Sequence, residues 1–303
     1  MSKILLTGAS GFLGKHIYNY LKQQEIEIIS IGRSPLNDIV CDLSIEVPFL
    51  DSDALSLVIH AAGKAHSIPK TAEEKEQFFS VNLQGTENLL KGLEKVGVPK
   101  QFVFISSVSV YGQQIGTNIN EEHCLMAEDA YGMSKIQAEK IVEEWSKRHN
   151  VICTILRLPL LVGKEPTGNL SLLLKIIEKG YYFNIGGGKA KKSMVLADDV
   201  AAFIPKVALV GGVYNLTDGY HPSFYELSTT IVKQKNKKVP FDMPLSLATL
   251  FGYVGDLMGS KAPINSLKLK KITSDLTFDD TKARQVVGWK PQSVLYYLEK
   301  NDI

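Results

Sequence analysis

The chain has 303 residues, of which 45% are hydrophobic and 22% charged, and its formal net charge is +2. This length and apolar content suffice for a full core, in one large domain or two smaller ones. The net charge is too small to argue for nucleic acid or an anionic membrane surface as a partner. The three cysteines are widely spaced and form no zinc-type cluster, so neither a disulfide framework nor a metal site is predicted.

The amino-terminal segment reads as a strand, a glycine turn and a helix. Residues 2–7 form a short apolar run, and glycine then recurs at every third position through Gly14. Gly8 and Gly11 allow a tight turn with the backbone close to a pyrophosphate, and Gly14 allows close packing of helix on strand. The amino end of the following helix attracts the same anion. The segment therefore predicts a dinucleotide-binding turn, with a glycine turn that binds no phosphate as the alternative.

The end of the second predicted strand should decide which cofactor binds. An acidic side chain there holds a ribose 2′-hydroxyl, whereas an arginine accepts a 2′-phosphate. The sequence has no acid at this place, and Arg33 and Ser34 therefore favour NADP(H). The alternative is that Arg33 is a solvated surface charge or stacks on the adenine.

Three residues further along the chain predict proton transfer. Ser107 ends an apolar strand, and ligands of open parallel sheets bind beyond the carboxyl ends of strands. Tyr131 and Lys135 are four residues apart at a predicted helix start, so they share a helical face. A neighbouring ammonium is expected to lower the high pKa of a phenol, which would make Tyr131 a usable acid and base. The alternatives are that Tyr131 and Lys135 are an ordinary pair on a helix surface and that Ser107 is a turn residue.

The remaining pattern alternates strands with helices. Strands are predicted at 3–7, 27–31, 39–41, 57–60, 101–106 and 151–156, with covering helices at 77–96 and 131–145. This alternation predicts an α/β fold with a doubly wound parallel sheet.

A second, smaller lobe is predicted after Pro159, where glycine-rich turns, a helix at 169–179 and a basic loop at 186–192 follow. The patterns at 194–207 and 213–216 indicate a return to the sheet. The predicted dinucleotide-binding domain is therefore 1–157 and 194–217, and the predicted substrate-binding lobe is 158–193 and 218–303.

Ordered motifs over nearly the whole length resemble the extended short-chain dehydrogenase/reductase family, in its group of NAD(P)-dependent nucleotide-sugar epimerases, dehydratases and ketoreductases. The motifs are the glycine turn, Val58-Ile-His60-Ala-Ala-Gly63, Val81-Asn82-Leu-Gln-Gly85-Thr86-Glu-Asn88, Ser106-Ser107 through Gly112, Tyr131 to Lys135, and Leu156-Arg157-Leu-Pro159. The resemblance implies a Rossmann-type fold with a smaller carboxyl-terminal lobe, and catalysis by Ser107, Tyr131 and Lys135.

The resemblance also implies binding positions for a cofactor and a substrate. The implied cofactor-binding residues are Gly8, Ser10, Gly11, Phe12, Leu13, Gly14, Arg33, Ser34, Asp42, Leu43, Ala61, Ala62, Gly63, Tyr131, Lys135, Leu158 and Pro159. The implied substrate-binding residues are Lys64, His66, Ser107, Val108, Asn169, Leu170 and Lys192. Asn169 and Leu170 match the pair that receives the diphosphate of a nucleotide sugar, and Lys192 matches a basic diphosphate ligand. Each of these three polar residues has an alternative interpretation: Asp42 could cap a turn, Asn169 could cap a helix, and Lys192 could belong to a solvated loop. His60 is expected to have a structural role.

Departures from the family pattern reduce the number of reactions that the resemblance allows. Its dehydratases have an Asp-Glu pair after the catalytic hydroxyl residue, where this chain has Val108 and Ser109, so dehydration is not expected. Galactose epimerases of the best-known type have an asparagine where this chain has Leu160. They also have a second arginine near the position of Asp275, where this chain has only Lys270 and Lys271. The stretch 156–193 is more similar to bacterial C4-epimerases and 4-ketoreductases of surface-polysaccharide pathways.

The leading hypothesis is reversible hydride transfer at C4 of a hexose in a nucleoside-diphosphate sugar, by a 4-ketoreductase or 4-epimerase that uses NADP or NAD. Arg33 tilts this toward NADPH and net reduction. The alternatives are a reductase of a small non-nucleotide ketone and a non-enzymatic dinucleotide sensor, and intact Tyr131 and Lys135 argue against the sensor.

The expected partners are the sugar nucleotide and a second copy of the chain, with neither nucleic acid nor a membrane. The chain enters a strand at Lys3, which leaves no room for a signal peptide, and the apolar stretch 245–258 is short and contains Asp256. The expected compartment is the cytoplasm.

Overall fold

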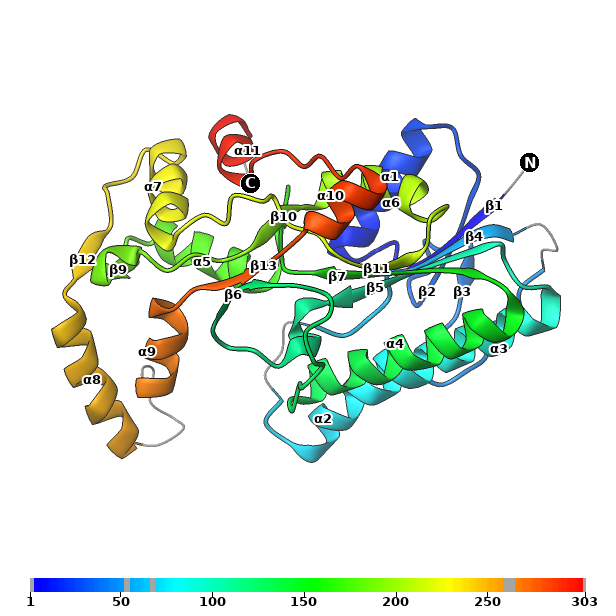
Figure 1. Ribbon diagram of the computed structural model, residues 1–303, viewed down its shortest axis with the longest axis horizontal. Coiled ribbons are helices and arrows are strands. Elements are labelled where there is room, and N and C mark those ends of the chain that lie inside the picture. The colour runs from blue at the N-terminus through cyan, green and yellow to red at the C-terminus, as the bar shows by residue number, and fades with distance from the viewer. Residues whose placement is uncertain (1–2, 52–54, 66–68, 259–264, 302–303) are drawn as a thin grey trace.

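A parallel sheet of seven strands forms the centre of the molecule in the computed structural model of the chain (Figure 1). The structure describes residues 3–51, 55–65, 69–258 and 265–301. The strands, in spatial order, are β11 (Gly212–Asn215), β7 (Ile152–Leu158), β5 (Gln101–Ser107), β4 (Leu55–His60), β1 (Lys3–Thr7), β2 (Ile28–Gly32) and β3 (Ile39–Val40). The chain runs outward from β1 through β2 to β3 and then returns to place β4 on the other side of β1. The predicted doubly wound parallel sheet is confirmed, and its switch point lies between β1 and β4.

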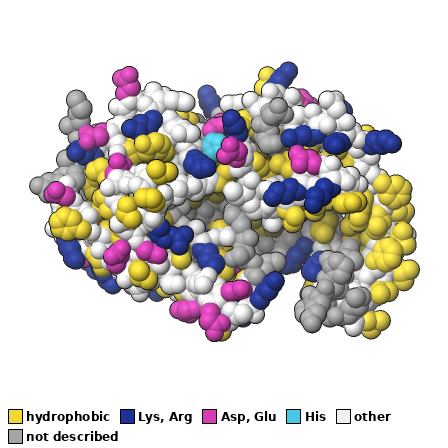
Figure 2. Space-filling model, turned by 180° about the vertical axis from the view of Figure 1, so that it is seen from behind, with side chains coloured by type: hydrophobic (Ala, Val, Ile, Leu, Met, Phe, Trp, Pro, Cys, Tyr) yellow, Lys and Arg dark blue, Asp and Glu magenta, His cyan; other side chains and the backbone are white. Residues whose placement is uncertain are grey.

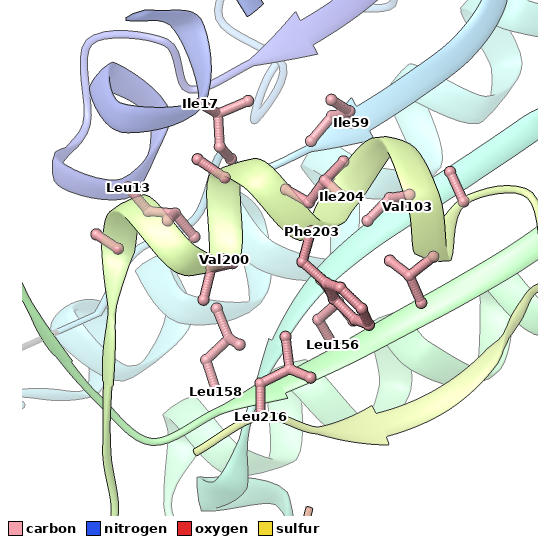
Figure 3. Close-up of a cluster of buried hydrophobic side chains, with 14 of the residues drawn as sticks. Leu13, Ile17, Ile59, Val103, Leu156, Leu158, Val200, Phe203, Ile204 and Leu216 are labelled. Carbon is pink, nitrogen blue, oxygen red and sulfur yellow. The ribbon is translucent and has the colours of Figure 1, made fainter. Parts of the chain in front are cut away.

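Helices cover both faces of the sheet, which explains why its strands are apolar on both sides. On one face lie α1 (Phe12–Gln23), α6 (Ala197–Val207) and α10 (Thr281–Val287), and on the other lie α2 (Ala72–Phe79), α3 (Gly85–Val96) and α4 (Ala130–His149). Successive strand residues point to opposite faces. Leu6 accordingly packs with the first set and Leu5 with the second. Figure 3 shows Phe203 and Ile204 of α6 beside Leu156 and Val103 of the sheet, in the same cluster as Leu13 and Ile17 of α1.

The helix predicted at 77–96 is divided in the structure. A π-helical turn, η1 (Ser80–Gln84), joins α2 to α3 without a break in the path. Such wide turns inside helices occur frequently at functional sites. Asn82 lies in this turn and is buried.

The rest of the chain forms a smaller layer of short elements beside the carboxyl ends of the central strands (Figure 1). Its elements are η2 (Val108–Tyr111), β6 (Gly116–Ile119), β8 (Leu160–Val162), α5 (Gly168–Glu178), β9 (Phe183–Ile185), η3 (Gly186–Gly188), β10 (Met194–Leu196), α7 (Phe224–Gln234), β12 (Phe241–Met243), α8 (Leu245–Met258), α9 (Ser266–Thr273), β13 (Leu276–Phe278) and α11 (Val294–Lys300). Six of these strands pair in parallel as three two-stranded sheets, β8 with β10, β9 with β12 and β6 with β13.

Segments from the two predicted domains are interleaved. Of the stretch predicted to return to the sheet, β11 joins the central sheet while β10 pairs with β8 outside it. Conversely, one residue of the predicted substrate lobe packs against the predicted dinucleotide-binding domain. Trp289 packs on Phe203 of α6, and its indole N–H donates to the carbonyl oxygen of Thr217 at 2.9 Å. The core on this face of the central sheet therefore includes Ala283, Val287 and Trp289 from near the end of the chain.

Candidate active site

The glycine turn after β1 has no room for side chains at two positions. Gly8 has φ +74°, and a Cβ there would lie 2.6 Å from the amide nitrogen of Ala62. A Cβ on Gly14 would lie 1.9 Å from the carbonyl oxygen of Gly8. Helix α1 starts at Phe12 with Gly11 as its N-cap, so its first amides point to the turn. This backbone cradle, at the switch point of the sheet, fits the pyrophosphate of a dinucleotide.

The other predicted cofactor residues border this turn or end a neighbouring strand. Ser10, Phe12 and Pro159 are at least partly exposed, whereas Leu13 and Leu158 are buried in the core beneath the turn. Ala61, Ala62 and Gly63 follow β4, the strand next to β1, and the amide of Ala62 donates to Thr7 Oγ1 at 3.0 Å. Leu13 and Leu158 can therefore meet a cofactor mainly through their backbone.

The predicted adenosine-binding residues lie at the ends of β2 and β3. Arg33 is exposed and Ser34 is partly exposed. Asp42 Oδ1 accepts hydrogen bonds from the amide of Ser44 at 3.0 Å and from its hydroxyl at 2.6 Å, so Asp42 caps a turn. Leu43 is buried, and its carbonyl oxygen accepts from Asn88 Nδ2 at 2.8 Å.

The structure brings together the three predicted catalytic residues. Asp129 is the N-cap of α4 and accepts a hydrogen bond from the amide of Gly132 at 3.0 Å, which fixes the start of the helix one residue before Tyr131. Tyr131 is hydrogen-bonded to Ser107, at the end of β5. Lys135 follows one turn later on the same helix, with its side chain buried.

Burial and local contacts set the pKa values of this pair. The pKa of Tyr131 is raised, because the effect of burial is larger than the lowering by the hydrogen bond with Ser107. The predicted lowering by Lys135 does not determine this pKa, because Lys135 Nζ donates to the carbonyl oxygen of Ile105 at 2.8 Å and lies 4.7 Å from the ring centre of Phe104. Burial lowers the pKa of Lys135 to about 8, against the opposing charge of Glu139. The Lys135 ammonium therefore loses its proton near pH 8.

Asn82 holds α4 to the loop after β4, a role that the sequence analysis did not give it. Its Oδ1 accepts from the amide of Lys64 at 2.7 Å, and its Nδ2 donates to Ser134 Oγ at 2.9 Å. Ser134 Oγ donates in turn to the carbonyl oxygen of Tyr131 at 2.8 Å. The π-helical turn that directs Asn82 inward has no signal in the apolar periodicity.

A buried ion pair, also missed at the sequence level, lies behind Lys135. Arg157 of β7 donates from Nη2 to Glu139 Oε2 at 2.7 Å, and the two side chains are 6% and 3% exposed. Ser106 Oγ donates to Glu139 Oε1 at 2.5 Å. Arg157 Nη1 also donates to Tyr111 Oη at 3.2 Å. The pair ties α4 to β7 and to β5, the strand that ends at Ser107.

His60 is structural, as expected. Its Nδ1 lies 2.6 Å from Thr7 Oγ1 and its Nε2 lies 2.9 Å from Thr86 Oγ1. Thr86 donates its hydroxyl proton to the carbonyl oxygen of Asn82, so His60 is the donor to Thr86 through Nε2. Complete burial, with a smaller effect from Lys135, lowers the pKa of His60 to about 3. The ring is neutral and fixes β4 against β1 and α3.

The residues predicted to bind substrate on the sheet side lie next to the predicted catalytic residues. Val108 begins η2 directly after Ser107 and is partly exposed. Lys64 lies at the loop bound by Asn82, and its Nζ donates to Gln77 Oε1 at 2.5 Å. His66 lies outside the described residues.

The residues predicted to bind the diphosphate are on the smaller layer. Asn169 is exposed in the first turn of α5, and Thr167 is the N-cap, so the cap interpretation of Asn169 is wrong. Leu170 is fully buried and can offer only its backbone. Lys192 Nζ donates to the carbonyl oxygens of Lys271 at 3.0 Å and Ser274 at 2.9 Å, which binds this loop to the end of α9.

Comparison with known proteins decides the family. The model of the NAD dependent epimerase/dehydratase family matches residues 4–216. The chain belongs to this family. One relative is the N-acetyl-alpha-D-glucosaminyl-diphospho-ditrans,octacis-undecaprenol 4-epimerase of Escherichia coli O157:H7, which is 32% identical over 92% of this chain and 88% of the relative.

Solved structures of similar proteins show the same fold. One is MoeE5 in complex with UDP-glucose and NAD, with a TM-score of 0.75 and 20% identity over 98% of this chain and 96% of that one. Another is RMD from Pseudomonas aeruginosa complexed with NADPH, with a TM-score of 0.73 and 21% identity over 99% and 97%. The predicted family, fold class and enzyme class, an NAD(P)-dependent epimerase/dehydratase family enzyme, are confirmed.

Proposed function

We propose that this enzyme epimerises C4 of a hexose linked to a nucleoside diphosphate. The proposal rests chiefly on one observation: Tyr131 is hydrogen-bonded to Ser107 and followed one turn later by Lys135, beside a glycine turn that fits a dinucleotide. The Escherichia coli relative, similar over almost the whole chain, is named as a 4-epimerase of a diphosphate-linked sugar. The absence of an Asp-Glu pair from the sequence after Ser107 argues against dehydration.

The chemistry that a nicotinamide cofactor supplies is reversible hydride transfer. In its ionised form, Tyr131 Oη would accept the proton of the C4 hydroxyl while the C4 hydride passes to the bound nicotinamide, which would give a 4-keto sugar. Ser107 donates a hydrogen bond to the reacting oxygen. Return of the hydride to the opposite face of the ketone, with return of the proton from Tyr131, would give the C4 epimer. Because the hydride and the proton both return to the sugar, no external reductant is consumed.

The diphosphate has two groups within the smaller layer that would receive it. The N-cap residue of α5, Thr167, makes no side-chain capping bond in the described structure, so the first amides of this helix remain available to an anion. Lys192 adds a positive charge, and burial lowers its pKa. Both groups would contact the diphosphate alone. They would therefore not distinguish a nucleoside from another group attached to the same diphosphate.

A 4-ketoreductase is the second candidate function, and Arg33 favours it. The side chain of Arg33 is exposed at the end of β2, where it can pair with a 2′-phosphate. A preference for NADPH suits net reduction, because an epimerase regenerates its cofactor and needs no cellular pool of reductant.

The proposal also includes the setting of the enzyme. It would act in the cytoplasm, as a homodimer, in the synthesis of a surface polysaccharide.

One incubation separates these functions. The purified protein is mixed with UDP-glucose, UDP-N-acetylglucosamine, GDP-mannose, a 4-keto sugar nucleotide or a small ketone, each with and without NAD or NADP(H), and the products are read by proton NMR. An epimerase gives the C4 epimer without net change in cofactor absorbance at 340 nm, whereas a ketoreductase oxidises NADPH only with a 4-keto sugar nucleotide. Turnover of small ketones alone, with no diphosphate dependence, would replace both proposals with the small-ketone reductase.

A further inference from the structure

The helix α8 buries its small residues and exposes its large apolar ones. Ala248, Gly252 and Gly255 are buried, and Gly252 faces Ser266 and Leu269 of α9. The large apolar side chains on the other sides of the helix are between 41% and 90% exposed: Leu245, Leu247, Leu250, Phe251, Tyr253, Val254 and Leu257. An amphipathic surface helix normally has the opposite arrangement.

Neighbouring elements extend this surface. Val239 and Phe241 beside α8 are 62% and 71% exposed, and Leu267 of α9 is 71% exposed. These residues and the exposed side chains of α8 are called the apolar patch here. Figure 2 shows apolar side chains gathered at the end of the molecule that contains α8, at the right of the view, with lysine and arginine side chains beside them. Exposed apolar surface of this extent marks a site for a membrane or a partner.

The charges around the apolar patch are mainly positive. Lys237 and Lys238 precede β12 and are exposed, as are Lys270 and Lys271 in the last turn of α9. The acids close by are engaged within the protein. Asp242 accepts from the amide of Gly187 at 2.7 Å, and Asp256 accepts from the amide and hydroxyl of Ser266 at 3.0 and 2.5 Å. This combination of exposed apolar groups and bordering lysines complements an anionic bilayer surface.

The helix is suited to lie on a bilayer and not to cross it. It spans 14 residues, and within the described part of the chain no helix is long and apolar enough to cross a membrane. We propose that the apolar patch docks this enzyme on the surface of an anionic phospholipid bilayer, with α8 in the interface.

Docking at this place would bring the bilayer close to the proposed diphosphate site. Lys192, at that site, is bound through its ammonium to the carbonyl oxygens of Lys271 and Ser274 at the end of α9, the helix against which α8 packs. Figure 2 shows that the surface is hollowed between this end and the body of the molecule. This part of the inference rests on the proposed function, because it extends the substrate class to a diphosphate sugar with a lipid carrier.

The test measures vesicle binding in the absence of sugar and cofactor. The full chain is sedimented with sucrose-loaded vesicles of phosphatidylcholine alone or with phosphatidylglycerol added. Wild type is expected to bind the anionic vesicles, and Leu250→Ser/Tyr253→Ser/Leu257→Ser is expected to bind at least about tenfold more weakly. The matched control, Ile45→Ser/Phe49→Ser/Leu209→Ser, removes exposed apolar side chains elsewhere and should bind as wild type.

Two results would overturn the docking surface. One is absence of wild-type binding to anionic vesicles. The other is equal binding by wild type and the α8 variant. If sedimentation equilibrium then shows a wild-type dimer that the α8 variant lacks, the patch is instead covered by a second copy of the chain. The α8 variant should retain wild-type turnover of a soluble nucleotide sugar, so failure of the proposed epimerase reaction, which would appear in wild type without vesicles, is distinguishable from failure of docking.

Discussion

Glu139 and Arg157 form a buried ion pair, with 2.7 Å between Oε2 and Nη2, one helical turn beyond Lys135. The same carboxylate accepts a hydrogen bond from Ser106, the residue before Ser107. One buried charge therefore contacts β5 and β7 from the helix that contains Tyr131 and Lys135. Its negative charge also raises the pKa of Lys135 against the effect of burial.

Glu139→Gln should lower the pKa of Lys135 below its value of about 8, because it removes the opposing charge. A lysine is charged below its pKa, so the loss of its charge moves to lower pH and the alkaline limb of the kcat profile moves with it. The variant also leaves Arg157 buried beside a neutral partner, which should cost about 3–5 kcal/mol in the free energy of unfolding.

Glu144→Gln is the control for that variant. Glu144 is exposed on the same helix and pairs with Lys140 at 3.9 Å. Its replacement should leave the pH profile unchanged and alter the free energy of unfolding by less than about 1 kcal/mol. A folded Glu139→Gln enzyme with the wild-type alkaline limb would show that Glu139 does not tune Lys135.

Tyr131→Phe should lose turnover by about 10²-fold or more, because it deletes the proton relay and little volume. The substitution removes one oxygen atom and leaves the ring in place, so folding and cofactor affinity should stay near wild type. Cofactor titration by fluorescence and single-turnover kinetics measure the two quantities separately. Turnover near wild type would remove Tyr131 from the mechanism.

Ser107→Ala should reduce kcat by about tenfold or more, since one hydrogen bond to the reacting oxygen is lost. The hydrogen bond with Ser107 lowers the pKa of Tyr131, so its removal should raise that pKa and move the limb for Tyr131 ionisation to higher pH. Ser109→Ala is the control, because Ser109 Oγ accepts from Ser107 at 3.1 Å without belonging to the proposed proton path. An unchanged rate in Ser107→Ala would leave Ser107 as a turn residue.

Arg33→Asp should shift cofactor preference from NADP(H) toward NAD(H), because it replaces a cation for the 2′-phosphate by an acceptor for the 2′-hydroxyl. A charge-assisted bond to a partly solvated phosphate contributes about 1.5–3 kcal/mol, or roughly ten- to a hundredfold in affinity. Arg148→Asp makes the same charge change at the exposed far end of α4 and should leave the preference unchanged. If wild type binds NAD as tightly as NADP, the argument for a ketoreductase fails.

The sequence by itself determined the features whose causes are local. The glycine turn could be read because only glycine tolerates the conformation and close approach found at Gly8 and Gly14. Tyr131 and Lys135 could be placed together because a four-residue spacing fixes one helical face. Each strand predicted for the central sheet is present with its ends shifted by at most two residues, because apolar runs bounded by turns mark buried parallel strands.

Only the tertiary structure decided how those elements meet. The contact of Lys135 with the Ile105 carbonyl, the pairing of Glu139 with Arg157 and the binding of Lys192 to the end of α9 join residues distant in sequence. The same holds for the outward face of α8, whose composition alone would suggest a buried helix. Periodicity and spacing report the conformation of a segment, whereas burial and the partner of a charge depend on which other segments pack against it.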